Sequence, residues 1–125
     1  MDGVMNSSSR FFDLRWQGDT ALLTVLLPRM SEEENLEQLD EDWYDLIEKQ
    51  YCRKMVLDLS NVRYMTSAAI GRMIGLHREL IRQEGQLVLC SLQREVIQTL
   101  ETSRLITYFK VAPNSESAVK LLANG

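Results

Sequence analysis

Residues 54–76 read KMVLDLSNVRYMTSAAIGRMIGL, an apolar run followed by a short connection and a helix-like periodicity. Met55–Leu59 is apolar except for Asp58, which is typical of a strand covered on both faces by helices. The pair Ser60-Asn61 favours a turn. The apolar face of the following helix has helical spacing and consists of Ile70, Met73, Ile74, His77, Leu80 and Ile81. We expect the functional site at this junction of strand and helix.

The start of that helix has two candidate N-caps, Thr66 and Ser67, because a hydroxyl there can accept a hydrogen bond from an unpaired amide of the first turn. A helix N-terminus also favours negative charge, so a phosphate on Ser67 would be tolerated. The same residues fit a structural role, in which Ser67 is only a cap and Ala68 and Ala69 let helix and sheet pack closely.

The N-terminal part predicts a leader and a hairpin. Residues 1–10 hold little to bury and are expected to be a flexible leader, with one domain over residues 11–125. Phe12, Leu14 and Trp16 alternate with polar residues, which predicts a half-buried strand. Gly18-Asp19 supplies a turn and Ala21–Leu27 a second strand, which Pro28 ends.

An acidic helix is predicted over residues 32–50, with Ser31 and Glu34 at capping-box spacing. Half of the acidic residues of the chain lie on it: Glu32, Glu33, Glu34, Glu37, Asp40, Glu41, Asp42, Asp45 and Glu48. They form either a solvated face or an electrostatic surface for a basic partner. Both interpretations fit the pattern.

The C-terminal part continues the alternation of strands and helices. Gly85 is expected as a left-handed helix stop, residues 86–90 as a buried strand, and Ser91 as the cap of the next helix. Residues 107–111 predict a short edge strand, and Asn114 or Ser115 caps a last helix. The fold class is therefore α/β: a mixed sheet with an N-terminal antiparallel hairpin and parallel strands, flanked by about four helices.

The composition is that of one ordinary globular domain: 125 residues, 45% hydrophobic, 26% charged, with a net charge of −4. The negative charge disfavours nucleic acid as a partner. The sequence predicts neither a signal peptide nor direct membrane insertion, so we expect a cytoplasmic protein. Cys52 and Cys90 lack metal or disulfide spacing and are expected to be reduced structural thiols.

The sequence contains no convincing pattern of catalytic or metal-binding residues. We therefore do not expect this protein to be an enzyme, to bind a metal ion or to need a cofactor. Asp58, Ser67 and His77 have the residue types of a catalytic triad. However, Ser67 and His77 are ten residues apart on one helix, a separation of about 15 Å, so we do not expect a triad. Gly71 and Gly75 lie inside the helix, where they favour close packing rather than a phosphate loop.

Several motifs together resemble the STAS domain of bacterial anti-sigma factor antagonists. They are Val56-Leu-Asp-Leu-Ser60, Val62-Arg-Tyr-Met-Thr-Ser67, Ala68-Ala-Ile-Gly71, Gly85-Gln-Leu-Val-Leu-Cys90 and Val96-Ile-Gln-Thr-Leu-Glu-Thr-Ser-Arg-Leu105. The resemblance covers roughly residues 11–122 and implies a four- to five-stranded mixed sheet with helices, without enzymatic activity.

In antagonists of this family, the loop before the second helix reads Asp-Ser-Ser-Gly-Leu-Gly, and its first serine is phosphorylated. The matching residues here are Thr66, Ser67, Ala68, Ala69, Ile70 and Gly71. Ser67 matches the phosphorylated serine, whereas Thr66, Ala68 and Ala69 depart from the pattern. The segment Leu27-Pro-Arg-Met30 also departs from the family's usual Gly-x-Leu/Val-Asp.

The resemblance implies a phosphoprotein that regulates transcription by partner switching. The unmodified chain would bind a kinase-type anti-sigma factor with a histidine-kinase-like ATP site, and phosphorylation of Ser67 would release it. The expected partner-binding residues are Arg29, Tyr64, Met65, Thr66, Ser67, Ala68, Ala69 and Ile70. Of these, Tyr64, Met65 and Ile70 are expected to be exposed and could also form a homo-oligomer surface. The alternative is a constitutive STAS adaptor, a scaffold of a signalling complex or a transporter accessory, that phosphorylation does not control.

Overall fold

The computed structural model describes residues 9–124, in which strands and helices alternate. In chain order the elements are β1 (Phe12–Gln17), β2 (Thr20–Val25), β3 (Arg29–Met30), α1 (Glu33–Gln50), β4 (Lys54–Asp58), β5 (Tyr64–Met65), α2 (Ser67–Arg82), β6 (Gln86–Cys90), α3 (Arg94–Thr102), β7 (Lys110–Ala112) and α4 (Ser115–Asn124). Five of these strands form one sheet in the order β1-β2-β4-β6-β7, antiparallel at β1–β2 and parallel elsewhere. The predicted fold class is confirmed.

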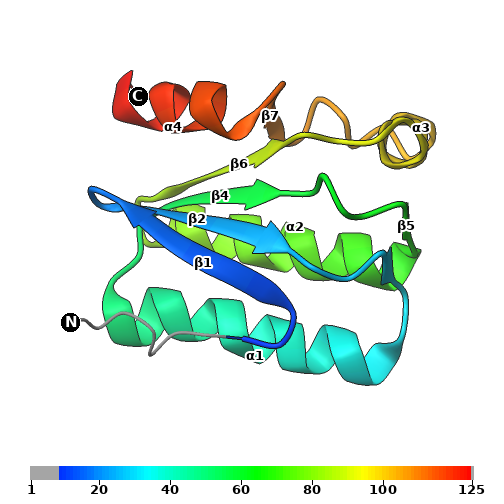
Figure 1. The fold of residues 1–125 in the computed structure, drawn as a ribbon, viewed down its shortest axis with the longest axis horizontal. Coiled ribbons are helices and arrows are strands. Elements are labelled where there is room, and N and C mark those ends of the chain that lie inside the picture. Colours follow the sequence, from blue (N-terminus) through cyan, green and yellow to red (C-terminus); the bar gives the residue numbers. More distant parts are fainter. Residues whose placement is uncertain (1–8, 125) are drawn as a thin grey trace.

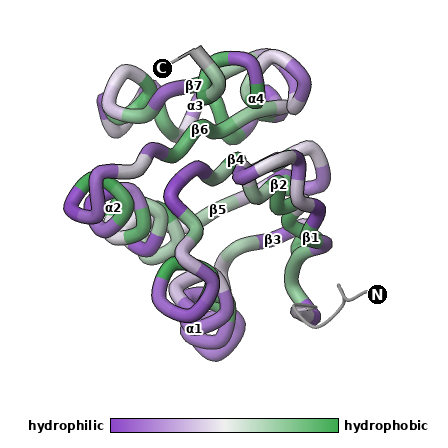
Figure 2. The backbone as a smooth tube through the Cα atoms, turned by 90° about the vertical axis from the view of Figure 1, so that its left-hand side faces the viewer, coloured by the Kyte–Doolittle hydropathy of each residue, from purple (hydrophilic) through white to green (hydrophobic). Residues whose placement is uncertain are grey.

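The two faces of the sheet are covered by different helices. Helices α1 and α2 lie on one face and α4 on the other (Figure 1). Neighbouring residues of a strand point to opposite faces. Leu57 accordingly belongs to the larger core, with Trp43 of α1, while Val56 belongs to the smaller core, with Ala118 and Leu122 of α4. Figure 2 shows apolar residues along the central strands and polar residues on the outer side of α1.

The predicted hairpin is present, although the second strand ends two residues earlier than expected. Gln17 pairs with Thr20 across a two-residue turn in which Gly18 has a φ of +62°. In β1, Phe12 is buried and Leu14 is half-buried, whereas Trp16 is 38% exposed. The predicted buried side of this strand is therefore wrong for Trp16, because β1 is an edge strand and Trp16 lies next to the hairpin turn.

Two predicted helix caps are wrong, and one is confirmed. Helix α1 begins at Glu33, and its N-cap, Glu32, makes no side-chain cap bond, so Ser31 and Glu34 form no capping box. Ser91 has a φ of +60°, and the residue at the N-cap of α3 is Gln93. In both cases the connection runs further than the pattern suggested. Asn114 does cap α4, since its Oδ1 accepts a hydrogen bond from the Ser117 amide at 2.8 Å.

Gly85 is required for a different reason from the one predicted. Helix α2 has its C-cap at Gln83, and Glu84, not Gly85, takes the left-handed conformation with a φ of +65°. A Cβ on Gly85 would collide with the backbone carbonyl of Arg53. That carbonyl accepts a hydrogen bond from the Gln86 amide at 2.8 Å, so α2 and β6 are joined through a close backbone approach to β4.

The sequence pattern missed a second, two-stranded parallel sheet. Strands β3 and β5 pair Arg29 with Tyr64 and Met30 with Met65. Two residues per strand are too few to produce a visible alternation. This small sheet ties the loop after β2 to the segment that enters α2, and the Thr66 amide continues the pairing by donating to the Met30 carbonyl at 3.1 Å.

The predicted leader of residues 1–10 lies mostly outside the described residues. Of the two that are described, Ser9 donates a hydrogen bond to Asp42 Oδ2 of α1 at 2.6 Å. Its oxygen also accepts from the Phe11 amide at 3.0 Å, so the chain is anchored to α1 just before β1. None of the helices in residues 9–124 is long and apolar enough to cross a membrane.

Candidate functional site

The candidate site surrounds the N-terminus of α2, at the end of the molecule where the parallel strands β4 and β6 finish (Figure 1). Thr66 has extended backbone, and its Oγ1 accepts a hydrogen bond from the Ala69 amide at 3.2 Å. Thr66 is therefore the N-cap, and of the two candidates the sequence offered, Ser67 is not the one used. The alternative role of Ser67 as a cap is ruled out in this geometry.

Ser67 is the first residue of α2, and its side chain is exposed. Within residues 9–124, neither its hydroxyl nor the amides of Ser67 and Ala68 have a hydrogen-bond partner. The first turn of α2 also contains no acidic residue. Unpaired amides and the positive end of the helix dipole favour an anionic group at this position. A negative charge on the Ser67 oxygen would therefore lie beside two unpaired amides at the positive end of the helix dipole.

Arg29 and Tyr64 lie together beside this turn. The register of β3 and β5 places them opposite each other, and the Arg29 guanidinium lies over the Tyr64 ring at 4.5 Å from its centroid. Tyr64 is 44% exposed and Arg29 is also exposed. The small sheet thus presents an aromatic ring and a cation at the surface, a combination that is common in protein interfaces.

The expectation that Met65 and Ile70 are exposed is wrong. Met65 is only 3% and Ile70 only 6% exposed, and Ala69 is fully buried. In β5 the side chains alternate, so Tyr64 faces solvent while Met65 faces the core. Ala69 and Ile70 lie on the face of α2 that packs into the same core. The exposed part of the predicted set is Arg29, Tyr64, Ser67 and Ala68, with Thr66 half-buried.

A hollow of about 470 Å³ lies between the first turn of α2 and helix α3. It is lined by Ser67, Ile70, Glu95, Gln98, Thr99, Thr102 and Ser103. The sequence analysis did not include the α3 residues in the site. Their polar side chains recur every three or four residues, a spacing that indicates one polar face of a helix. Glu95 is the only charged residue in this lining, so a phosphate on Ser67 would have a carboxylate rather than a cation beside the hollow.

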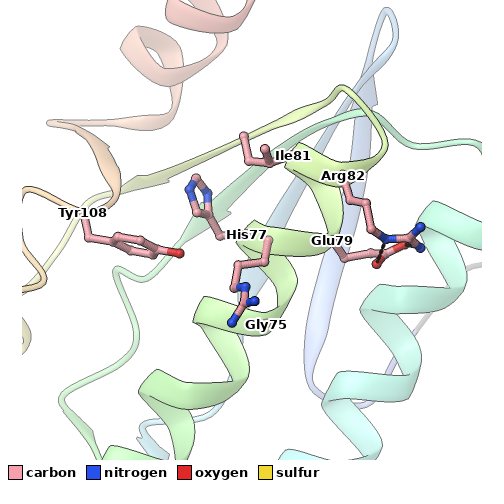
Figure 3. A pocket seen from close by; sticks show the side chains of 7 residues that line it. Gly75, His77, Glu79, Ile81, Arg82 and Tyr108 are labelled. Carbon is pink, nitrogen blue, oxygen red and sulfur yellow. Dashed lines mark hydrogen bonds and ion pairs between the residues drawn. The ribbon is translucent and has the colours of Figure 1, made fainter.

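His77 lies toward the other end of α2, beside a hollow of about 600 Å³ (Figure 3). Its ring packs edge-on against Tyr108 and Phe109, with centroid separations of 5.1 and 5.7 Å. Burial lowers the pKa of His77 below its ordinary value. Asp58 is engaged elsewhere, since its Oδ1 accepts from the Ser60 amide at 2.9 Å. The structure does not assemble Asp58, Ser67 and His77 into a triad.

The two helix glycines have different environments. A Cβ on Gly75 would lie 3.1 Å from the Tyr44 hydroxyl of α1, so Gly75 does allow close packing, whereas a Cβ on Gly71 would meet nothing within 4 Å. The prediction is confirmed for Gly75 and wrong for Gly71.

The acidic helix α1 is joined to α2 by one arginine. Arg72 donates to Glu33 Oε2 at 2.8 Å and to Asp40 Oδ2 at 2.9 Å. These two carboxylates raise the pKa of Arg72. The acidic face of α1 is therefore partly neutralised by its neighbour, while Glu34, Glu37, Glu41 and Glu48 remain exposed.

Both cysteines are buried and unpaired. Burial raises the pKa of Cys52 and of Cys90 to about 11, so each thiol is protonated at neutral pH. A protonated, buried thiol is a poor nucleophile. The thiols therefore take no part in the site.

Comparison with known proteins places the chain in a family. The family model of the STAS domain matches residues 32–118, so the chain belongs to the STAS domain family. Among its relatives is BtrV of Bordetella bronchiseptica, whose name assigns it provisionally to the anti-sigma factor antagonists. It is 31% identical over 97 residues, which span 78% of this chain and 83% of BtrV.

Solved structures share the fold at lower identity. A Thermotoga maritima protein with the same provisional assignment has a TM-score of 0.81 at 19% identity, covering 90% of this chain and 94% of its own. SpoIIAA, described as a Bacillus cell fate determinant and solved in its phosphorylated form, has a TM-score of 0.67 at 19% identity, covering 87% of this chain and 96% of its own. At these identities the likeness concerns the fold.

Proposed function

We propose that this STAS protein is an anti-sigma factor antagonist that is switched by phosphorylation at Ser67. Its partner is an anti-sigma factor that is also a serine kinase with a histidine-kinase-like ATP site. The name of BtrV supports the antagonist class. The observation that carries the switch is the exposed Ser67 hydroxyl at the first position of α2, without a hydrogen-bond partner in residues 9–124 and next to two unpaired amides.

In the phosphorylation step, this chain supplies the acceptor hydroxyl of Ser67, and the kinase supplies the catalytic groups. The Ser67 oxygen attacks the γ-phosphorus of ATP, the bond to the β-phosphate oxygen breaks, and ADP leaves. The hydroxyl proton passes to a base of the kinase, because His77 lies ten residues further along α2 and packs against Tyr108. The amides of Ser67 and Ala68 then stabilise the phosphate, so α2 stays folded.

The unmodified surface binds the partner through its exposed side chains. Tyr64, with Arg29 over its ring, supplies an aromatic anchor, and the hollow between α2 and α3 receives a side chain of the partner. Phosphorylation adds a charge of about −1.5 to −2 at the rim of that hollow. The new charge must be desolvated on binding, and Glu95, which lines the same hollow, is also negative, so the affinity for the partner falls.

The test is a pull-down from a lysate of the source cells, with the wild-type chain, Ser67→Ala and Ser67→Asp as baits. Wild type and Ser67→Ala should retain an ATP-binding kinase-type protein that Ser67→Asp loses. Ser115→Asp is the matched control, because Ser115 is likewise the first residue of a helix and follows a capping side chain, Asn114. Its bait should retain the partner. Equal retention by Ser67→Asp and wild type would rule out the switch.

A constitutive STAS adaptor is the second candidate. The departure of Thr66 from the acidic residue usual in antagonists favours it. An adaptor retains the same partner with all the baits, and that partner then identifies the complex or transporter it serves.

A further inference from the structure

The outer edge of strand β1 is the strongest feature of the molecule that the proposed function does not use. β1 is the terminal strand of the five-stranded sheet, paired with β2 on one side only in residues 9–124. Figure 2 likewise shows β1 at the periphery, away from α2 and β6. An edge strand presents unpaired amides and carbonyls, which are a template for pairing with another strand.

The hydrogen bonds between β1 and β2 show which backbone amides and carbonyls of β1 point away from β2. The Leu26 amide donates to the Phe11 carbonyl at 2.8 Å, and residue 11 therefore faces β2. Along an antiparallel strand, the backbone groups alternate between the two sides. Residues 13, 15 and 17 hence also face β2, and the free edge presents the amides and carbonyls of Phe12, Leu14 and Trp16.

This edge is complementary to itself in one register. When two copies of β1 run antiparallel about a two-fold axis at Leu14, the outward groups of Leu14 meet those of the second Leu14, and Phe12 meets Trp16. Asp13 of one copy then lies opposite Arg15 of the other, twice. These are non-hydrogen-bonded positions, where opposing side chains approach most closely. Centring the axis on Phe12 or Trp16 leaves most of the strand unpaired, and centring it on Asp13 or Arg15 places two like charges opposite each other.

Within one chain these two charges have no ionic partner. Asp13 lies opposite Thr24 and Arg15 opposite Leu22, both side chains are exposed, and neither forms an ion pair in the described residues. When an edge strand carries a cation and an anion two residues apart on one face, antiparallel pairing about a two-fold axis between them forms two pairs of opposite charge. Trp16, 38% exposed, would be covered in the same step.

We propose that β1 is a self-association edge, at which a second copy of this chain pairs antiparallel about Leu14 and the two five-stranded sheets become one. The pairing is isologous and closed, so it gives a dimer and not a filament. It uses no residue of the candidate site, which lies on α2, α3, β3 and β5. Ser67 remains accessible in the dimer, and the proposal is independent of the function of Ser67.

The test is sedimentation equilibrium of the full chain from low micromolar to near-millimolar concentration. Wild type should form a dimer. Asp13→Arg and Arg15→Asp should each weaken it about tenfold or more, because each variant places two like-charged pairs across the two-fold axis. An equimolar mixture of the two variants should restore a one-to-one dimer, since every cross-strand pair is then of opposite charge. Glu37→Arg and Lys120→Asp, with the same changes of net charge at exposed helical positions, should dimerise like wild type.

Three results would overturn the proposal: a wild-type chain that stays monomeric throughout, single variants that dimerise as wild type does, or a mixture that remains monomeric. The substituted side chains are exposed, and circular dichroism of each variant verifies that the fold is retained.

Discussion

At the start of α2, the neighbouring hydroxyl groups of Thr66 and Ser67 have different hydrogen-bonding roles. Thr66 caps the helix through its Oγ1, and Ser67 has no partner in the described residues. We predict that Thr66→Ala lowers the free energy of unfolding by about 1 kcal/mol, the usual value of a lost N-cap, and that Thr66→Ser largely preserves it. Urea denaturation measures both. The matched variant Ser67→Ala should change stability far less, and an equal loss there would mean that Ser67 shares the capping.

His77 makes stability depend on pH, because burial lowers its pKa below the ordinary value of about 6.5. The unfolded chain then binds a proton at a higher pH than the folded chain, so the free energy of unfolding decreases as the pH falls through and below that value. The slope is at most about 1.4 kcal/mol per pH unit, the limit for one proton. Denaturation of wild type and His77→Phe at pH 5 and 7.5 tests this, and a parallel dependence in both would contradict it.

At the scale of single residues, the sequence indicated that a hydroxyl caps α2 but left Thr66 and Ser67 open. Both fit the pattern, and only the backbone conformation at residue 66 decides which one points back to the Ala69 amide. The exposure of Met65 was misjudged because a two-residue strand gives no period from which to read its inner side. The role of the α3 residues depends on tertiary packing, which local patterns do not contain.

At the scale of elements, Gly85 joins α2 to the sheet by letting two backbones approach closely. We predict that Gly85→Ala destabilises the fold by about 1–3 kcal/mol, because the added methyl group meets the Arg53 carbonyl, which cannot rotate away. Gly71→Ala is the opposite case, an open site inside a helix, and should stabilise by about 0.5–1 kcal/mol. Thermal melts of both variants give the signs, and a stabilised Gly85→Ala would contradict the packing described.

The long elements were predictable because their hydrophobic periods are clear. The helical spacing in α1 predicts a buried face of Leu36, Leu39, Trp43, Leu46, Ile47 and Tyr51. The prediction is confirmed for all but Tyr51, which lies at the C-cap and is 78% exposed. The middle of β4 is buried as its apolar run predicts. The ends were less predictable. Ser31 and Ser91 have the residue types of caps, but the N-caps of α1 and α3 are Glu32 and Gln93, one and two residues later, and neither makes a side-chain cap bond.

At the scale of the whole molecule, the two surfaces for which we propose functions lie at different places on the main sheet. The N-terminus of α2 and the polar face of α3 lie at the carboxyl end of the parallel strands (Figure 1). The free edge of β1 lies at the side of the sheet. A dimer through β1 therefore carries two copies of the Ser67 site, and a partner could engage both, which would raise its apparent affinity without new contacts.

The most direct test of the central claim is phosphoryl transfer to Ser67 by the captured partner. The chain and its Ser67→Ala variant are incubated with ATP and the partner, the sites are mapped by mass spectrometry, and the complex is followed by size-exclusion chromatography. We predict one phosphate on Ser67, none on the variant, and dissociation of the wild-type complex only. Transfer to another residue, no transfer at all, or a complex that survives phosphorylation of Ser67 would contradict the account.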